Sequence, residues 1–359
     1  MGDGHNTAAR SIADALMSER PGGVEVLVAD PYTRTNPMIN RLVQSGYTLA
    51  INRYPRAWKI VFQLLSRRGV VEGMSPLLSE LRQGVKDIIE EFQPDLIAST
   101  YPVFSYILAK LRKSHPQIRQ PFYTVVTDST LINSTWYRWR SDGLIVSDAL
   151  TAEAICEGGV PSAEIHTLGF PVSLSFEKLS PIPAPTGKQP WKILFVPGGT
   201  SRRAKETIQS LVRMKNITVQ VVTGRRKKMF SSLTAAHFPS NVSISGWTDQ
   251  MPAIMASHHL FIGKAGGATV QEAIAAQLPF LVSHIVPGQE EGNIELIQRT
   301  GIGALASSSA EVVGGLVEGA LANDAQLWRA WRKNLEAIQK PSAARSIAHF
   351  LLEKIPPAV

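Results

Sequence analysis

The amino-acid sequence predicts an α/β protein with two similar halves, each built on a parallel sheet. Along both halves, short apolar runs alternate with segments of helical periodicity, which is typical of βαβ units. The alternation stops at Ser180–Gly187, a proline-rich stretch typical of a linker, and then starts again. The chain length of 359 residues also suits two domains better than one.

The first half begins with a helix. We expect helices at 8–19, over most of 36–92 and at 105–114, and strands at 24–30, 96–100, 122–127 and 143–147. The loop Gly2–His5 leads into the first helix, and in an α/β domain such a loop normally follows a buried strand. No strand precedes it here, so we expect the first strand of this domain to be missing and the native start to lie upstream of Met1.

The second half repeats the pattern after the linker. We expect strands at 192–196, 218–222, 242–245, 260–263 and 280–282, and helices at 204–214, 251–256, 269–276 and 294–299, followed by a helical tail at 325–354. These elements divide the chain into an N-terminal domain at 1–179, a linker at 180–190, a C-terminal domain at 191–340 and a final helix at 341–359.

The composition limits the classes of partner. A formal net charge of +8 and a pI of about 9.6 attract anions without specifying which anion. The sequence lacks an arginine-rich arm, zinc-finger spacing and an aromatic ribonucleoprotein signature, so we expect no nucleic-acid partner. Cys156 is the single cysteine, which excludes an internal disulfide and a thiolate metal cluster. Without an apolar run of about 18 residues, and with a polar N-terminus, we expect neither a transmembrane helix nor a signal peptide.

The most informative motif is the run from Gly263 to Ala273, in which an apolar strand meets glycines and then a helix. Glycines allow backbone N–H groups to approach an anion, and a helix N-terminus favours negative charge. Thr269 fits the N-cap position, and one turn later the Glu272 carboxylate can accept hydrogen bonds from two ribose hydroxyls. The same residues also fit a tight turn with a capping-box glutamate, which holds no ligand.

A second motif, Pro287–Asn293, follows the next expected strand. Its amide and carboxylate side chains donate and accept hydrogen bonds, which suits sugar hydroxyls. An ordinary polar loop has the same composition. The two motifs together are more specific for a nucleotide sugar than either one alone.

Three blocks of the second half, Gly246–Met251, Gly263–Glu272 and Pro287–Asn293, resemble the C-terminal domain of monogalactosyldiacylglycerol synthases and of the related processive diacylglycerol glucosyltransferases. The wider family includes the lipid-linked N-acetylglucosaminyltransferase of peptidoglycan synthesis. The blocks follow the family's order and spacing, and Gly2–Ala9 resembles its N-terminal glycine-rich loop ending in histidine. The resemblance covers nearly the whole chain and is strongest in the C-terminal half.

This resemblance implies a GT-B fold, in which two Rossmann-like domains with parallel sheets face each other across a cleft. It implies metal-independent transfer of a hexose, with inversion, from a UDP-sugar donor to a lipid acceptor, and diacylglycerol is the acceptor we expect. No metal and no cofactor are implied, because the UDP-sugar is a substrate. It also implies that the final helix, 341–359, returns to the N-terminal domain.

The resemblance assigns donor-binding residues in the second half. By position, Gly246 and Trp247 would lie near the uracil, and Glu272 would bind the ribose. The turn before the helix would face the pyrophosphate, together with the second glycine-rich loop at Gly198–Ser201; the following Arg202 and Arg203 either add charge there or are surface residues. Gln289, Glu290 and Asn293 would reach the donor sugar. The full set of expected donor contacts is Gly199, Thr200, Gly246, Trp247, Lys264, Gly266, Gly267, Ala268, Thr269, Glu272, Gln289, Glu290 and Asn293.

In the first half the resemblance points to His5 and Asp128 as catalytic residues, with Gly4 and Asn133 beside the substrate. Inverting transfer needs a base for the acceptor hydroxyl, and neutral histidine suits that role at pH 7. Asp128 follows a strand, where α/β sheets place ligands, and is either the base or the group that orients His5. The structural alternatives are a packed histidine at a helix start and an Asx turn. Relatives often carry a histidine where this chain has Asn133, which cannot titrate.

Two basic segments bear on membrane contact. Tyr54–Gly69 is interpreted either as an amphipathic helix in a membrane interface or as a core helix with a solvated basic stripe. Arg225–Lys228 is either a solvated turn or a contact for anionic headgroups. We therefore expect a cytoplasmic protein that is peripheral on the inner face of the cell membrane, with the anionic membrane surface as a partner.

Three alternatives use the same donor motifs. The first is transfer to a polyprenyl-linked or other sugar acceptor. The second is 2-epimerisation of a UDP-sugar, which needs no membrane face. The third is binding of a UDP-sugar without transferase activity.

Overall fold

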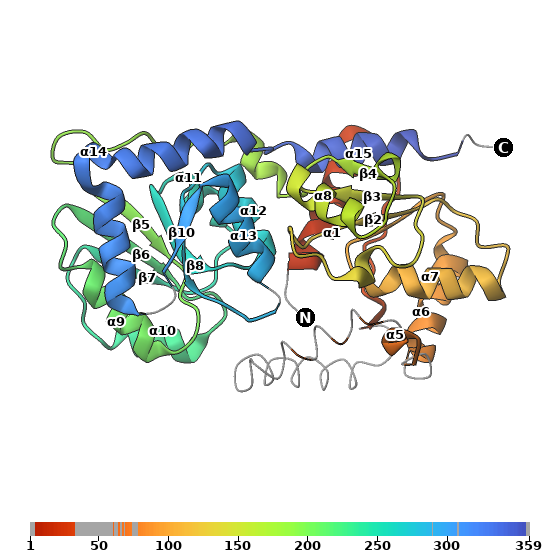
Figure 1. Cartoon of the computed structure of the whole chain (residues 1–359), viewed down its shortest axis with the longest axis horizontal. Helices are drawn as coiled ribbons and strands as arrows, with labels where there is room; N and C mark the ends of the chain where they lie inside the picture. Colours follow the sequence, from red (N-terminus) through yellow and green to blue (C-terminus); the bar gives the residue numbers. More distant parts are fainter. Residues whose placement is uncertain are drawn as a thin grey trace. The chain divides into compact units, whose positions relative to one another are not determined.

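A computed structural model of the chain describes residues 4–32, 60, 64, 67, 69–73, 78–288, 290–306 and 309–356. The chain forms two compact units (Figure 1). Unit 1 comprises Met1–Leu174, Pro287–Gly292 and Ser342–Val359, and unit 2 comprises Ser175–Val286 and Asn293–Pro341. Pro287–Gly292, which the sequence pattern assigns to the C-terminal domain, belongs to unit 1, because packing rather than chain order defines a compact unit.

Unit 1 contains a four-stranded parallel sheet. Its strands are β1 (Ile97–Ser99), β2 (Phe122–Val125), β3 (Gly143–Val146) and β4 (Ile165–Thr167), in the order β1-β2-β3-β4. Every residue of β2 and β3 is buried, as expected for parallel strands covered on both faces. The sequence predicts β1, β2 and β3; it misses β4, which is too short and too polar to show a strand pattern.

The helices of unit 1 precede the sheet, connect its strands or come from the C-terminal end of the chain. They are α1 (Gly4–Glu19), α5 (Val70–Gly73), α6 (Ser79–Phe92), α7 (Val103–Ser114), α8 (Ala149–Glu157) and α15 (Ala343–Glu353), with short 3-10 turns η1 (Ser134–Trp136) and η2 (Ser162–Glu164). α15 packs on α1 through the small buried residues Ala15, Ala344 and Ala348. The C-terminal helix of the chain is therefore part of unit 1.

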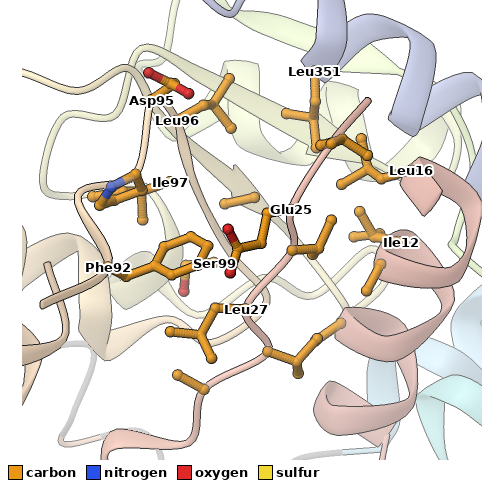
Figure 2. A pocket seen from close by; sticks show the side chains of 18 of the residues that line it. Ile12, Leu16, Glu25, Leu27, Phe92, Asp95, Leu96, Ile97, Ser99 and Leu351 are labelled. Atoms are coloured by element: carbon orange, nitrogen blue, oxygen red, sulfur yellow. The ribbon is translucent and has the colours of Figure 1, made fainter. Parts of the chain in front are cut away.

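The predicted strand at 24–30 is wrong. Val24–Asp30 runs without turns or bends but belongs to no sheet. Among the described residues, none makes a backbone hydrogen bond with Val24–Ala29. The apolar extended conformation agrees with the sequence pattern, but a strand also needs a paired neighbour, and among the described strands β1 pairs with β2 alone. Val24–Ala29 and β1 both line a cavity of about 510 Å³ (Figure 2).

Unit 2 contains a six-stranded parallel sheet. Its strands are β5 (Trp191–Phe195), β6 (Ile217–Val222), β7 (Val242–Ser245), β8 (Leu260–Lys264), β9 (Phe280–His284) and β10 (Gly303–Leu305). The order is β10-β9-β8-β5-β6-β7, so the chain builds outward from β5 in one direction and then crosses to β8 on the other side. The point between β5 and β8 is a topological switch point, where open α/β sheets bind ligands at the carboxyl ends of the strands.

Helices surround this sheet (Figure 1). They are α9 (Ser201–Leu211), α10 (Lys227–Thr234), α11 (Met251–Ala256), α12 (Gly267–Ala275), α13 (Glu291–Thr300) and α14 (Ala310–Ile338), and the turn η3 (Leu174–Lys178) precedes the sheet. The predicted single tail helix is in fact α14 and α15, which are separated around Pro341. α14 is itself interrupted at Ala322–Ala325, where Asn323, Asp324 and Ala325 have positive φ.

The proline-rich stretch Ser180–Gly187 is hydrogen-bonded to the rest of unit 2. Ile182 N donates to the Ala256 carbonyl at 3.1 Å, and His259 Nε2 forms a hydrogen bond with the Pro183 carbonyl at 3.0 Å. Burial lowers the pKa of His259 to about 4, so this histidine is a neutral structural side chain. No helix in the described parts of the chain is long and apolar enough to cross a membrane.

Candidate active site

The candidate donor site of unit 2 lies at the carboxyl ends of β5 and β8, on both sides of the switch point. The loop after β5 contains Gly198 and Gly199, and the loop after β8 contains Gly266. Because β5 and β8 are hydrogen-bonded neighbours, both glycine-containing loops leave the same edge of the sheet side by side. The structure therefore brings the two predicted glycine loops together.

The N-terminus of α12 presents free backbone donors. Gly266 is the N-cap and supplies no side-chain cap, and Val270 N is the first amide that returns to the Gly266 carbonyl, at 3.0 Å. The N–H groups of Gly267, Ala268 and Thr269 precede that bond and have no intrahelical acceptor. Together with the helix dipole, they form a site for an anion such as a phosphate.

The prediction that Thr269 is the N-cap is wrong. The helix begins at Gly267, directly after a short loop from β8, so Thr269 lies inside the first turn. Its side chain lies beside the anion site and does not cap the helix. Lys264, the last residue of β8, is exposed at the same end of the sheet.

Glu272 lies one turn further along α12. Its carboxyl group is largely desolvated, and this burial raises its pKa to about 7. A carboxyl group with that pKa is half protonated at neutral pH and gains from a ligand that donates hydrogen bonds to it. A pair of ribose hydroxyls is such a ligand.

Asn293, at the start of α13, is hydrogen-bonded to the turn before α12. Its Nδ2 donates to the Ala265 carbonyl at 2.9 Å, directly before the N-cap of α12. Its Oδ1 is buried and accepts no hydrogen bond from any described residue. A buried acceptor without a donor is costly unless a ligand supplies one. Asn293 is 4% exposed, so the ligand that reaches Oδ1 must enter the site.

The loop after β5 is shaped by a histidine that sequence analysis misses. A Cβ on Gly198 would lie 2.5 Å from the Cβ of His284, so the backbone passes directly over this side chain at the end of β9. Gly199 has a φ of 66°, which favours glycine. Thr200 accepts a hydrogen bond from Arg203 N at 3.3 Å and caps α9. A histidine at the end of a strand was detectable in the sequence, but its contact with a loop far away in sequence was not.

Two arginines after β6 belong to the same edge of the sheet. The Arg225 guanidinium lies 5.3 Å from the ring centre of Trp247, which is 59% exposed and follows Gly246. Arg226 donates to the Pro197 carbonyl in the loop after β5. Arg225 lies in the turn after β6 and Lys227 begins α10, so the expected turn is confined to the start of Arg225–Lys228. Contact of this segment with anionic headgroups stays a prediction. Arg202 is exposed and pairs with Glu206 on α9 at 2.8 Å.

The candidate catalytic residues of unit 1 lie together at the carboxyl ends of β1 and β2. His5 is in the first turn of α1, so it lies on a helix and not in the expected loop, and Gly4 is the first residue of that helix. His5 Nδ1 and Thr127 Oγ1 form a hydrogen bond of 2.6 Å. Thr100 Oγ1 donates to the His5 carbonyl at 2.9 Å.

Asp128 is held by Trp136, whose Nε1 donates to Asp128 Oδ2 at 2.7 Å. Burial lowers the pKa of His5, an effect that the negative charge of Asp128 opposes. Burial also raises the pKa of Asp128, opposed by the positive charge of His5 and by the Trp136 hydrogen bond. Thr127, rather than Asp128, orients the His5 ring, and sequence analysis does not single out Thr127. The neutral imidazole that results is suited to accept a proton.

Asn133 has a structural role. Its Oδ1 accepts hydrogen bonds from Thr135 N at 3.0 Å and Thr135 Oγ1 at 2.8 Å, which caps η1. Its assignment as a substrate-binding residue stays a prediction.

The remaining predicted residues are only partly described. Glu290 is buried, whereas Gln289 lies outside the described residues. The segment 54–69 also lies outside them, apart from Ile60, Leu64, Arg67 and Gly69. The described residues include no group of three or more His, Cys, Asp or Glu placed to hold a metal ion.

Two family models match consecutive parts of the chain. Residues 5–172 match the model of the monogalactosyldiacylglycerol (MGDG) synthase family, and residues 193–294 match that of the glycosyltransferase family 28 C-terminal domain. A probable MGDG synthase of Nicotiana tabacum is 23% identical over 99% of this chain and 69% of its own length. A processive diacylglycerol β-glucosyltransferase of Bacillus cereus is 25% identical over 98% of this chain and 91% of its own. The crystal structure of UGT71G1 from Medicago truncatula with UDP-glucose superposes with a TM-score of 0.60, covering 99% and 96% of the two chains at 14% identity.

The two parallel α/β units and these matches define a glycosyltransferase with the GT-B fold. Its N-terminal part is similar to the MGDG synthase family, its C-terminal part is similar to the glycosyltransferase family 28 C-terminal domain, and MGDG synthases and processive diacylglycerol glucosyltransferases resemble it along most of its length.

Proposed function

We propose that the protein transfers a hexose from a UDP-sugar to diacylglycerol, with inversion and without a metal ion. The observation that carries the proposal is the grouping, in unit 2, of a helix N-terminus without a side-chain cap, a desolvated carboxyl group and a buried amide oxygen that accepts no hydrogen bond from a described residue. These three features fit, in order, a pyrophosphate, a ribose and a sugar hydroxyl.

The donor fits this site from its nucleotide end to its sugar end. The exposed Trp247 with Arg225 offers a flat surface for the uracil, and Glu272 accepts hydrogen bonds from the ribose hydroxyls. The N–H groups at the start of α12 receive the pyrophosphate, opposite Gly199. These donors take the place of a metal ion by stabilising the negative charge that develops on the leaving UDP. Asn293 Oδ1 then accepts from a hydroxyl of the sugar.

Transfer forms one bond and breaks another at the anomeric carbon. The acceptor oxygen attacks from the face opposite UDP, the bond to the UDP oxygen breaks, and the configuration inverts. The acceptor hydroxyl proton passes to Nε2 of His5, in the tautomer in which Nδ1–H donates to Thr127 Oγ1. Asp128 stabilises the imidazolium through its charge.

Diacylglycerol as the acceptor is supported by the names of the relatives. The Bacillus cereus relative is a diacylglycerol glucosyltransferase, and the Nicotiana relative is a probable monogalactosyldiacylglycerol synthase. A lipid acceptor requires contact with a membrane surface, and the net charge of +8 favours an anionic one. We propose peripheral attachment to that surface.

Product analysis tests the chemistry. UDP-glucose and UDP-galactose are α-linked, so the lipid product should show the proton–proton coupling of a β-glycoside by NMR. Product formation should be unchanged in EDTA. An α-linked product would contradict inversion, and loss of activity in EDTA would contradict metal independence.

A further inference from the structure

His284 lies at the carboxyl edge of the unit 2 sheet, among the loops of the candidate donor site. It is the last residue of β9 and pairs in register with Lys264, the last residue of β8. Gly266, the N-cap of α12, follows Lys264 by two residues, so His284 and the N-terminus of α12 lie at the same edge of the sheet. The side chain is half-buried, which shields it partly from water and leaves it accessible to a ligand.

The imidazole ring occupies the space that side chains at positions 198 and 199 would need. A Cβ on Gly198 would lie 2.5 Å from Cβ and 2.9 Å from Cδ2 of His284. A Cβ on Gly199 would lie 3.4 Å from Nδ1 and 3.5 Å from Cε1 of the same ring. The length of the ring is therefore packed against the loop after β5, which is the loop expected to face the pyrophosphate.

Arg226 contacts the same loop from the opposite direction. It follows β6, and its guanidinium donates to the Pro197 carbonyl. In the sheet order β9-β8-β5-β6, the loop after β5 is thus contacted by a side chain from the β9 side and by one from the β6 side. These contacts hold the loop in place without a ligand, and donors that are already in position stabilise a negative charge most effectively.

An independent observation points to a ligand at this edge. Asn293, whose side chain is hydrogen-bonded to the turn before α12, is 4% exposed, and its Oδ1 accepts no hydrogen bond from a described residue. The edge therefore combines a buried acceptor with the backbone donors at the start of α12. A nucleoside diphosphate joined to a sugar has a hydroxyl for the acceptor and phosphate oxygens for the donors.

We propose that His284 binds the pyrophosphate of the donor, with a ring N–H donating a hydrogen bond to a phosphate oxygen beside Gly199. This inference rests on the proposed function, because it assigns a further residue to the same donor. An imidazole has an N–H in both of its protonation states, so the contact does not depend on the charge of the ring. The reaction product UDP retains both phosphates and makes the same contact.

Calorimetric titration of the full chain with uridine and with UDP tests the proposal. His284→Phe keeps a ring beside Gly198 but has no N–H, so the affinity for UDP should fall about 10- to 100-fold, as for loss of a hydrogen bond to a charged group. Uridine lacks the phosphates, so its affinity should stay within about twofold of wild type, which also shows that the variant is folded.

Amide variants separate the hydrogen bond from the shape of the ring. His284→Asn places an N–H near the position of Nδ1, and His284→Gln places one near Nε2. One of the two should therefore keep its affinity for UDP within about threefold of wild type. The matched control is His258→Phe, at a buried histidine two residues before β8 and hence at the opposite edge of the sheet, which should leave both affinities unchanged.

The outcomes distinguish this inference from the proposed function. Unchanged UDP affinity in His284→Phe would overturn the inference alone. Equal losses of uridine and UDP affinity, or amide variants that bind UDP no better than His284→Phe, would also overturn it, because they would show that His284 acts only by packing. A wild-type protein that bound no UDP would contradict the proposed function together with the inference.

Discussion

The amide side chain of Asn293 donates from Nδ2 to the carbonyl oxygen of Ala265 at 2.9 Å, while its Oδ1 stays buried without a donor among the described residues. One side chain therefore holds the turn before α12 and offers an acceptor to a ligand. In the proposed function this links the geometry of the pyrophosphate site to recognition of the sugar.

Replacing Asn293 should weaken donor binding more than it weakens the fold. Asn293→Ala removes both the support of the Ala265 carbonyl and the acceptor for the sugar, so we expect the KM for the UDP-sugar to rise about 10- to 100-fold. The matched control is Asn241→Ala, because Asn241 Nδ2 also donates to a backbone carbonyl of unit 2, that of Ile217 at 3.1 Å. Equal effects of the two substitutions on KM would show that Asn293 has no ligand.

Glu272 should make the affinity for UDP depend on pH. Its pKa is raised to about 7, and ribose hydroxyls bind the ionised form better, so UDP affinity should increase from pH 6 to pH 8. Glu272→Gln should lower the affinity at pH 8 by about 10- to 100-fold and remove the pH dependence. Calorimetric titration at several pH values measures both effects. A wild-type affinity that falls with pH would contradict ribose binding by this carboxylate.

The same pKa shift affects stability in the opposite direction. A carboxyl group with a raised folded-state pKa stabilises the fold below its unfolded-state pKa, and this contribution is lost as the pH rises through about 7. Without ligand, the free energy of unfolding of wild type should fall by roughly 1–3 kcal/mol between pH 4.5 and pH 8, relative to Glu272→Gln. Denaturant titrations of both proteins measure the difference. Parallel pH profiles would show that Glu272 is not desolvated.

Protonation of His5 should determine how kcat for transfer falls at low pH. Burial lowers its pKa below the usual 6.5, so kcat at saturating donor should be constant from pH 7 to pH 8.5 and fall only below about pH 6.5. Thr127→Val removes the hydrogen bond that orients the ring and should lower kcat about tenfold, with the KM for the donor unchanged. A normal kcat in His5→Gln would show that another group is the base.

The C-terminal helix should be needed for the stability of unit 1. Ile347 of α15 is fully buried with Ile12 and Val125, so Ile347→Ala should reduce the free energy of unfolding by about 2–5 kcal/mol. The half-exposed Leu327 supplies the control, because Leu327→Ala should change stability by less than about 0.5 kcal/mol. Chemical denaturation compares them. A similar small effect for both would show that α15 is dispensable for unit 1.

Most of the fold could be predicted because buried parallel strands have a simple pattern. β2, β3, β8 and β9 are apolar runs bounded by turns, and all were predicted within a residue or two. Pairing could not be predicted in the same way: Val24–Ala29 has the composition of a strand, but no described strand pairs with it. β4 and β10 were missed because three residues are too few to show a period.

The candidate site was predictable where one continuous segment forms it. Gly266–Glu272 is such a segment, and the structure places it at the switch point of the sheet. Residues that act across long sequence distances were not predicted. Arg226 reaches Pro197, His284 lies under Gly198, and Thr127 contacts His5 only because the strands bring their ends together. These contacts depend on strand order, which single-sequence patterns do not give.

Release of UDP by the purified chain tests the central claim most directly. UDP-glucose, UDP-galactose and UDP-N-acetylglucosamine would each be supplied with anionic vesicles that contain or lack diacylglycerol, with Glu272→Ala as the donor-site control. The account predicts that at least one hexose donor is consumed, that consumption requires diacylglycerol, and that Glu272→Ala abolishes it. Binding of a UDP-sugar without release under any of these conditions, or release that is indifferent to diacylglycerol, would contradict the account.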